Sequence, residues 1–193
     1  MKLLVLDNYD SFTYNLVYML RAENVVVDVF RNDKIEGQAC LSYDGIILSP
    51  GPGLPKEAGS LMTIINTCNS NVPILGVCLG HQAIAAHLGA NLSLLNGVFH
   101  GVQSQIKQTT IKSPLFHNVE QNFLAARYHS WEVCSSAKGQ MDVIATTENG
   151  NIMAIQDLKK NLFGVQFHLE SIMSPDGQQI IKNFLSICNN VKS

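Results

Sequence analysis

A cysteine stands between two glycines in the stretch Gly76-Val-Cys-Leu-Gly-His-Gln82. The apolar run 72–77 is typical of a buried strand and 80–87 of a helix, so Cys78 is expected in the sharp turn between them. Small residues two positions before and after the cysteine relieve crowding where strand and helix cross, as in a nucleophile elbow. The helix N-terminus favours a thiolate, and the backbone N–H of Leu79 is expected to face a developing oxyanion. The alternative is a buried cysteine beside two packing glycines.

A cysteine nucleophile needs a base and a group that orients the base. His168 follows an apolar run, and Glu170 lies two residues further on, so in an extended chain both side chains share one face. The carboxylate would fix the imidazole tautomer and stabilise the imidazolium. A solvated His-x-Glu at a strand end is the alternative. The other histidines are expected to be structural or superficial at positions His81, His87 and His117, while His100 and His129 are less clear.

A loop rich in proline and glycine occupies residues 49–55, Ser-Pro-Gly-Pro-Gly-Leu-Pro, directly after an apolar strand signal. Its prolines exclude a helix, and its glycines let backbone N–H groups approach a ligand closely. The carboxyl ends of parallel strands are where such sheets bind ligands. We therefore expect Gly53 to supply a second oxyanion donor, against the alternative of an ordinary turn.

The elements that must position these residues alternate in the first half of the chain. Strands are predicted at 2–6, 25–30, 45–48 and 72–77, and helices at 11–21 (with Ser11 as N-cap), 59–67 and 80–87. Short strands then follow at 105–111, 123–127, 142–147, 152–155 and 163–167, with an Asn149-Gly150 hairpin turn and a final helix at 176–188. This predicts a single α/β domain, 1–193, with a mostly parallel, flavodoxin-like central sheet flanked by helices and extended by antiparallel strands.

Composition excludes several classes of protein. Hydrophobic residues make up 46% and charged residues 15%, unlike a disordered chain, a coiled coil or a collagen. No apolar run approaches the ~20 residues that cross a bilayer, and no signal-peptide core follows the N-terminus. The net charge is −2 with scattered basic residues, and the five cysteines are irregularly spaced. We expect a cytoplasmic protein with no nucleic-acid or membrane partner and no metal site.

The motifs together resemble the class I (triad-type) glutamine amidotransferases over essentially the whole chain. Within that family the sequence is similar to the small subunits of anthranilate synthase and of aminodeoxychorismate synthase. The resemblance rests on five motifs, which are Asp7-Asn-Tyr-Asp-Ser-Phe-Thr-Tyr-Asn15, Ser49-Pro-Gly-Pro-Gly53, Gly76-Val-Cys-Leu-Gly-His-Gln82, Arg127-Tyr-His-Ser130 and Gly164-Val-Gln-Phe-His-Leu-Glu-Ser171.

The resemblance implies a role for each matching residue. Cys78, His168 and Glu170 would be the catalytic triad, with Leu79 and Gly53 forming the oxyanion hole. Glutamine would be held by Gly51, Pro52, Gly53, Gln82, Ser130 and Trp131. A synthase partner, anthranilate synthase component I or aminodeoxychorismate synthase component I, would contact Asn8, Asp10, Ser11, His100 and Gly101. The family reaction needs no cofactor in this chain, and its ammonia would pass to the chorismate-using partner.

Two positions depart from the family pattern. Leu169 replaces the usual proline between His168 and Glu170, and Trp131 stands where leucine is frequent. Gly53 favours the anthranilate type, because folate-type relatives often carry cysteine there. The alternatives are the folate enzyme, a small subunit shared by both pathways, and a catalytically silent regulatory subunit. A free-standing esterase or peptidase is disfavoured, because it would not need the motifs at 8–14 and 127–130.

Overall fold

The computed structural model describes residues 1–95, 97, 99–134 and 141–191. The strands are β1 (Lys2–Asp7), β2 (Val26–Arg31), β3 (Gly45–Leu48), β4 (Ile74–Val77), β5 (Leu92–Leu94), β6 (Val102–Gln108), β7 (Asn122–Arg127), β8 (Trp131–Val133), β9 (Asp142–Thr147), β10 (Ile152–Asp157) and β11 (Leu162–Val165). The α-helices are α1 (Thr13–Ala22), α2 (Leu61–Cys68), α3 (Leu79–His87) and α4 (Gly177–Val191). Short 3₁₀ helices cover Gly37–Ser42, Pro55–Glu57 and Pro114–Phe116.

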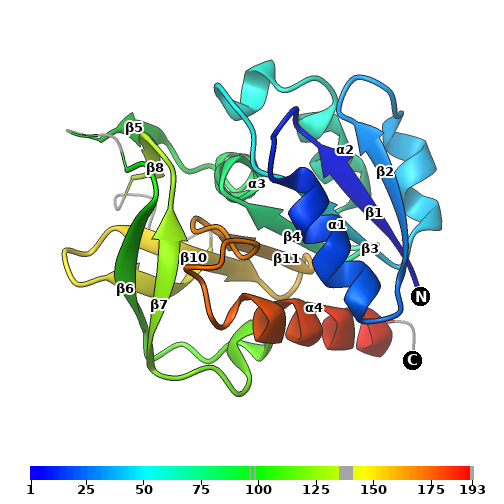
Figure 1. Ribbon diagram of the computed structural model, residues 1–193. Helices are drawn as coiled ribbons and strands as arrows, with labels where there is room; N and C mark the ends of the chain where they lie inside the picture. Colours follow the sequence, from blue (N-terminus) through cyan, green and yellow to red (C-terminus); the bar gives the residue numbers. More distant parts are fainter. Residues whose placement is uncertain (96, 98, 135–140, 192–193) are drawn as a thin grey trace.

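The main sheet has nine strands in the order β2-β1-β3-β4-β11-β10-β9-β6-β7, and β5 pairs with β8 in a small second sheet (Figure 1). Strands β2, β1, β3, β4 and β11 are parallel, while β10, β9, β6 and β7 continue the sheet antiparallel. The parallel half has the flavodoxin-like order, with β11 in the fifth place. The predicted fold class is therefore confirmed.

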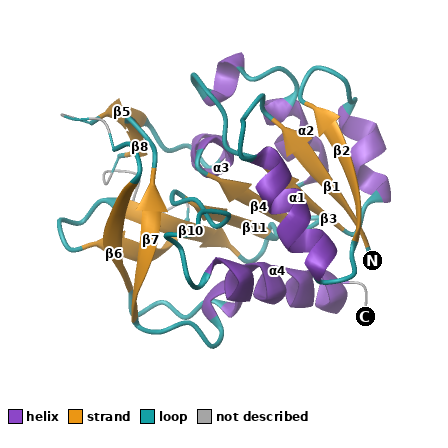
Figure 2. Cartoon of the chain, viewed as in Figure 1, coloured by secondary structure: helices purple, strands orange, loops and turns teal. Residues whose placement is uncertain are grey.

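The parallel strands are covered on both faces (Figure 2). Leu3 and Val5 of β1 belong to one buried cluster with residues of α1 and α4. Leu4 and Leu6, which point the other way, belong to a second cluster with residues of α2 and α3. Because successive side chains of a strand alternate between faces, a strand buried on both faces needs an unbroken apolar run. This explains why the signal at the start of the chain is continuous rather than alternating.

Two local predictions are wrong. The first helix begins at Thr13, and neither Ser11 nor the N-cap residue Phe12 provides a side-chain cap. The Asp7 carboxylate organises this turn instead, because its Oδ1 accepts hydrogen bonds from Tyr9 N (2.9 Å) and Thr13 Oγ1 (3.0 Å). The strand predicted at 105–111 lies at 102–108 as β6, whose largely exposed side chains give no clear alternation.

Other elements follow the prediction more closely. The β9–β10 hairpin turns at Asn149-Gly150, where Gly150 has a φ of +82°. The short pair β5–β8 was not expected, because three-residue strands leave no periodic signal. Within the described residues, no helix is long and apolar enough to cross a membrane.

The topology brings the ends of four neighbouring parallel strands to one edge. Strands β1, β3, β4 and β11 are adjacent, and each ends there inside or immediately before one of the sequence motifs. The segments that follow them begin at Asn8, Ser49, Cys78 and Gln166. The sheet edge that binds ligands in parallel α/β folds is therefore the edge that carries the candidate residues.

Candidate active site

Cys78 occupies a strained turn between β4 and α3. Its φ of +52° and ψ of −100° lie outside the regions that side chains favour. A Cβ atom at Gly76 would lie 2.3 Å from Gly80 C, and one at Gly80 would lie 2.5 Å from Leu48 O. Helix α3 therefore lies so close to β4 at Gly76 and to β3 at Gly80 that only glycine fits at both positions. The predicted elbow geometry is present, with Cys78 at the N-cap of the helix.

His168 and Glu170 form a buried pair. His168 Nδ1 lies 2.5 Å from Glu170 Oε1, with side-chain exposures of 4% and 1%. A turn, closed by Ser171 N donating to His168 O, brings the carboxylate to the ring, rather than the extended chain we expected. His168 N donates to Ala126 O (3.0 Å), and Ser174 Oγ donates to His168 O (2.6 Å), which fixes the backbone of the histidine.

The carboxylate contact determines how the imidazole is used. With a proton on Nδ1 shared with Glu170, Nε2 is the ring atom available to Cys78. Nε2 is buried and has no hydrogen-bond partner among the described residues. Catalytic hydrogen bonds of this kind often form fully only when substrate binds. Burial by itself lowers the pKa of His168, but Cys78 and Glu170 together outweigh burial and raise it to about 10. The site therefore favours an imidazolium beside the cysteine sulfur.

A cavity of about 200 Å³ opens beside Cys78. All six of the residues expected to hold glutamine line it, namely Gly51, Pro52, Gly53, Gln82, Ser130 and Trp131. The loop is packed tightly, because a Cβ at Gly51 would lie 2.6 Å from Asn8 Cβ and 2.8 Å from Leu79 Cδ2. Gly53 has a φ of +74°, which glycine tolerates and most residues do not. Tyr128 and His129 complete the lining.

A chain of hydrogen bonds supports the floor of this cavity. Gln82 Nε2 donates to Trp131 O (2.9 Å) and to Gln166 Oε1 (3.1 Å). Trp131 O also accepts from His129 Nδ1 at 2.8 Å, and His129 Nε2 accepts from Arg127 Nε at 3.0 Å. Burial lowers the pKa of His129 to about 4, so this histidine is neutral and carries its proton on Nδ1. The Arg127 guanidinium lies 3.6 Å from the centre of the Phe99 ring.

Sequence reasoning missed Gln166, Tyr128 and the support given by Arg127 and His129. Gln166 is fully buried, and its Nε2 lies 3.6 Å from Cys78 Sγ. A polar residue inside the apolar run 162–169 was the available signal, because a buried amide must find partners. Tyr128 packs against the His168 ring at a centroid distance of 4.8 Å, which local patterns do not record.

The residues expected at a partner interface fall into two groups. Ser11, His100 and Gly101 are exposed, and Asp10 is half-buried. Asn8 is only 2% exposed, and its side chain contacts Ser49 O at 2.8 Å and Asn32 Nδ2 at 3.1 Å. Asn8 therefore ties the end of β1 to the loop that follows β3.

A group of aromatic side chains links this surface to His168. Phe12, which is 39% exposed, lies 5.8 Å from Tyr128 and 6.2 Å from His168 between ring centres. His100 meets Tyr128 edge-on at 5.7 Å. Burial is the main reason why the pKa of Asp10 is raised. Asp10 also interacts electrostatically with His168, which lowers its pKa, and with Glu170, which raises it. Exposed residues thus contact the groups that pack directly on His168.

His81 has the structural role that the sequence suggested. Its side chain is fully buried beneath the elbow, where burial lowers its pKa to about 3, so it is neutral. A Cβ at Gly164 would lie 2.8 Å from His81 Nδ1, so the ring packs directly on β11. His87 contacts Asn66 Oδ1 through Nδ1 at 2.7 Å, away from the cysteine.

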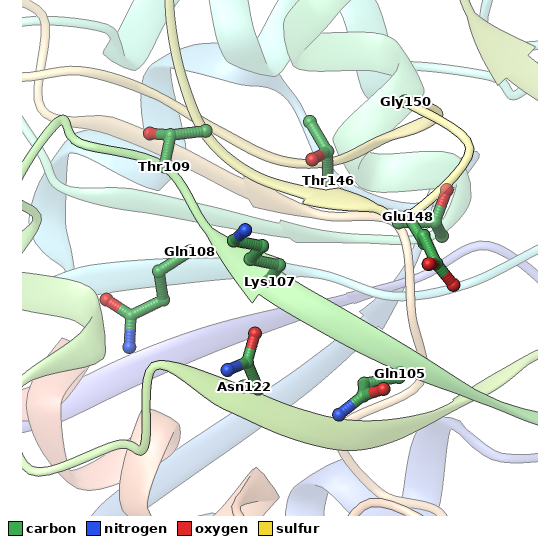
Figure 3. Close-up of a pocket in the computed structure, with 9 residues that line it drawn as sticks. Gln105, Lys107, Gln108, Thr109, Asn122, Thr146, Glu148 and Gly150 are labelled. Carbon is green, nitrogen blue, oxygen red and sulfur yellow. The ribbon is translucent and has the colours of Figure 1, made fainter.

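A larger cavity, of about 570 Å³, lies on the antiparallel part of the sheet (Figure 3). Its walls come from β6, β7 and the β9–β10 hairpin, and Lys107 and Glu148 are its charged residues. None of Cys78, His168 and Glu170 is among the described residues that line it. Size alone therefore does not identify the candidate site, and the smaller cavity is the one lined by Cys78.

The chain matches known proteins along nearly its whole length. A model of the family "Glutamine amidotransferase class-I" matches residues 4–188. Anthranilate synthase component 2 of Lactococcus lactis is 42% identical, covering 98% of this chain and 96% of the relative. The protein of the same name from Cyanophora paradoxa is 42% identical over 97% of this chain and 100% of its own length.

A solved structure extends the comparison to the fold. A putative GMP synthase subunit from Thermoplasma acidophilum is 24% identical and superposes with a TM-score of 0.89, covering 100% of this chain and 96% of that one. This likeness concerns the fold alone. The family match and the curated relatives establish more: the chain belongs to the class I glutamine amidotransferases.

Proposed function

We propose that this chain hydrolyses the side-chain amide of L-glutamine and supplies the ammonia to a chorismate-using synthase. The Cys78 thiolate attacks Cδ of glutamine, and the N–H groups of Leu79 and Gly53 hold the resulting oxyanion. His168 protonates the nitrogen as the C–N bond breaks, which releases ammonia and leaves a thioester. Water, deprotonated by His168, then attacks the thioester and releases glutamate.

One observation carries this proposal. The elbow cysteine, the His168–Glu170 pair and a cavity of about 200 Å³ meet at one sheet edge. The cavity has room for a small amino acid, and its walls offer amides and backbone groups rather than a cluster of like charges. Both N–H bonds of Gln82 are used internally, so its Oε1 is the atom left to accept a hydrogen bond from the substrate ammonium.

The role as one component of a larger synthase is supported by the relatives. Several are named anthranilate synthase component 2, and one from Thermotoga maritima is named bifunctional protein TrpGD. We therefore propose a tryptophan-pathway partner, anthranilate synthase component I. The folate-pathway partner is the second candidate, favoured only by the general similarity of the two small subunits. The intact triad disfavours a silent regulatory subunit.

The partner would dock on the surface beside the site. We propose that it contacts Asp10, Ser11, His100 and Gly101, with Asn8 holding the loop behind them in place. The aromatic contacts from Phe12 through Tyr128 to His168 support this choice, because a partner that displaces Phe12 would also displace the ring that packs on His168. We also propose a single domain in a reducing, cytoplasmic setting. In keeping with this, none of the five cysteines, all of which lie in the described part of the chain, forms a disulfide, and Cys40, Cys68 and Cys188 are buried away from the site.

The experiment compares two nitrogen sources in the assembled complex. Cys78→Ser should abolish product formation from chorismate and glutamine, yet spare product formation from chorismate and an ammonium salt, since only ammonia release needs the thiolate. Cys188→Ser, at a buried cysteine far from the site, is the matched control and should retain both activities. Persistent glutamine-dependent turnover in Cys78→Ser would refute the nucleophile assignment.

A further inference from the structure

The side chain of Gln166 contacts the candidate nucleophile directly. Its Nε2 lies 3.6 Å from Cys78 Sγ, although the two residues are 88 positions apart in the sequence. Gln166 follows β11 and is fully buried, so no water competes for its amide. The triad mechanism assigns no role to this contact, and a buried amide aimed at a reactive sulfur calls for an explanation.

The direction of the contact is fixed by its neighbours. Trp131 O is a backbone carbonyl and can only accept, so the Gln82 side chain must present Nε2 to it. The second N–H of Gln82 then meets Gln166 Oε1 at 3.1 Å, which turns Gln166 Nε2 toward the sulfur. Arg127 Nε can only donate, so His129 Nε2 accepts its hydrogen bond and the ring proton lies on Nδ1. His129 Nδ1 therefore donates to Trp131 O, the same carbonyl that Gln82 contacts. The orientations of the Gln82 and Gln166 side-chain amides are thereby fixed.

We propose that Gln166 is a further catalytic residue of this site, whose side-chain N–H holds the Cys78 sulfur as a thiolate aimed into the substrate cavity. An N–H donor stabilises an anion more than a neutral thiol, and the contact strengthens in a dry environment. The inference rests on the proposed function, because it concerns the nucleophile of that reaction.

The same chain of hydrogen bonds joins the nucleophile to the substrate pocket. Gln82 lines the cavity and holds the Gln166 amide in the orientation that donates to sulfur. A substrate that binds Gln82 Oε1 therefore contacts the same side chain that orients the Gln166 amide. Gln82 thus has a positioning role toward Cys78 in addition to its proposed contact with glutamine.

The test measures the thiol rather than the reaction. Cys78 alkylation by iodoacetamide is followed by peptide mass spectrometry from pH 5 to 10, which separates Cys78 from the partly exposed Cys134. Gln166→Met preserves length and removes the donor, so the alkylation midpoint should rise by about one pH unit, the worth of one hydrogen bond to a charged group. In the complex, glutamine-dependent kcat should fall about tenfold with a smaller change in KM.

Two further variants sharpen the result. Gln166→Glu keeps the shape and the acceptor for Gln82 but presents an oxygen to the sulfur, so the midpoint should rise further than in Gln166→Met. If Gln166→Met fails to fold, the alkylation midpoint of Gln166→Glu tests the same hydrogen bond to the Cys78 sulfur. Gln82→Met releases the Gln166 amide and should raise the midpoint too, with less than additive effect in the double variant, because both changes break one chain.

The control is Gln156→Met, at another buried glutamine, whose Nε2 contacts Lys112 O and Asp142 Oδ2 away from the site. Its alkylation midpoint should match that of the unaltered chain. An unchanged midpoint in folded Gln166→Met would overturn the inference. Absence of glutamine hydrolysis by the unaltered complex would instead refute the proposed function, while the alkylation result would still report on Gln166.

Discussion

A Cβ atom at Gly76 would lie 2.3 Å from the carbonyl carbon of Gly80, across the turn that carries Cys78. Real Cβ atoms do not approach a backbone so closely, so β4 and α3 cross at a distance that excludes any side chain. This crossing leaves Cys78 little room for an ordinary conformation and is accompanied by its φ of +52°. The placement of Cys78 in the turn and the strain of its backbone are thus two results of one packing contact.

Gly76→Ala should therefore disrupt the site. The added methyl group meets backbone rather than a flexible side chain, so helix α3 must move, and overpacking of this kind costs about 1–3 kcal/mol. We expect a lower melting temperature and loss of Cys78 alkylation at neutral pH. Gly97→Ala is the control, because nothing lies within 4 Å of a Cβ there. Equal melting temperatures for the two variants would contradict the crowding argument.

The stability of the free chain should fall as the pH rises. The folded-state pKa of His168 is raised from 6.5 to about 10, so the imidazolium stabilises the fold fully below pH 6.5. This stabilisation is lost as the pH passes through about 10. Melting temperatures measured from pH 6 to 10 should therefore decline more steeply for the unaltered chain than for His168→Gln, which cannot carry the charge. Parallel curves would show that His168 is not charged in the folded state.

Leu169→Pro should leave stability nearly unchanged. Leu169 follows His168 in a turn closed by Ser171 N and His168 O, a position where proline fits. Proline restricts the unfolded chain, a gain of about 0.4–1 kcal/mol. Leu169 is 1% exposed, however, and the loss of about one buried carbon costs ~0.8 kcal/mol.

The control for this change is Leu169→Ala, which should cost about 2–5 kcal/mol because it empties the same buried space. Thermal melts of both variants compare the two effects, and glutamate release should survive in Leu169→Pro. A loss as large as that of alanine would mean that the turn does not accommodate proline.

Synthase binding should activate the glutaminase. One well-placed oxyanion donor is worth ~10²–10³ in rate, so a site completed by its partner should release glutamate at least ~10-fold faster with synthase and chorismate than alone. Phe12→Ala should lower this activation ratio, because Phe12 is exposed and contacts the Tyr128 and His168 rings.

The matched control is Tyr18→Ala, further along α1, where the side chain is 63% exposed and touches neither ring. Its activation ratio should equal that of the unaltered chain. Equal glutamate release with and without the synthase would exclude gating, yet would leave the triad assignment standing.

Much of the site could be predicted from local sequence. The elbow needs only a strand, a turn and a helix within a dozen residues, and the glycines at 76 and 80 mark their crossing. The unbroken apolar runs at 2–6 and 45–48 predict buried parallel strands, because both faces of such strands are covered. The His168–Glu170 contact spans two residues, so it too lies within the reach of a local pattern.

The three-dimensional structure alone decided which distant residues meet. Sequence patterns indicate which side chains are buried. The order of the strands depends on how the elements pack together, and a hydrophobic run does not specify which strand will pair with it. Only the pairing of β11 with β4 brings Gln166 to Cys78 Sγ, across 88 residues, and only the packing of Trp131 O beside α3 orients Gln82. The candidate nucleophile was therefore indicated by local sequence, whereas the groups that contact and orient it were fixed by long-range packing.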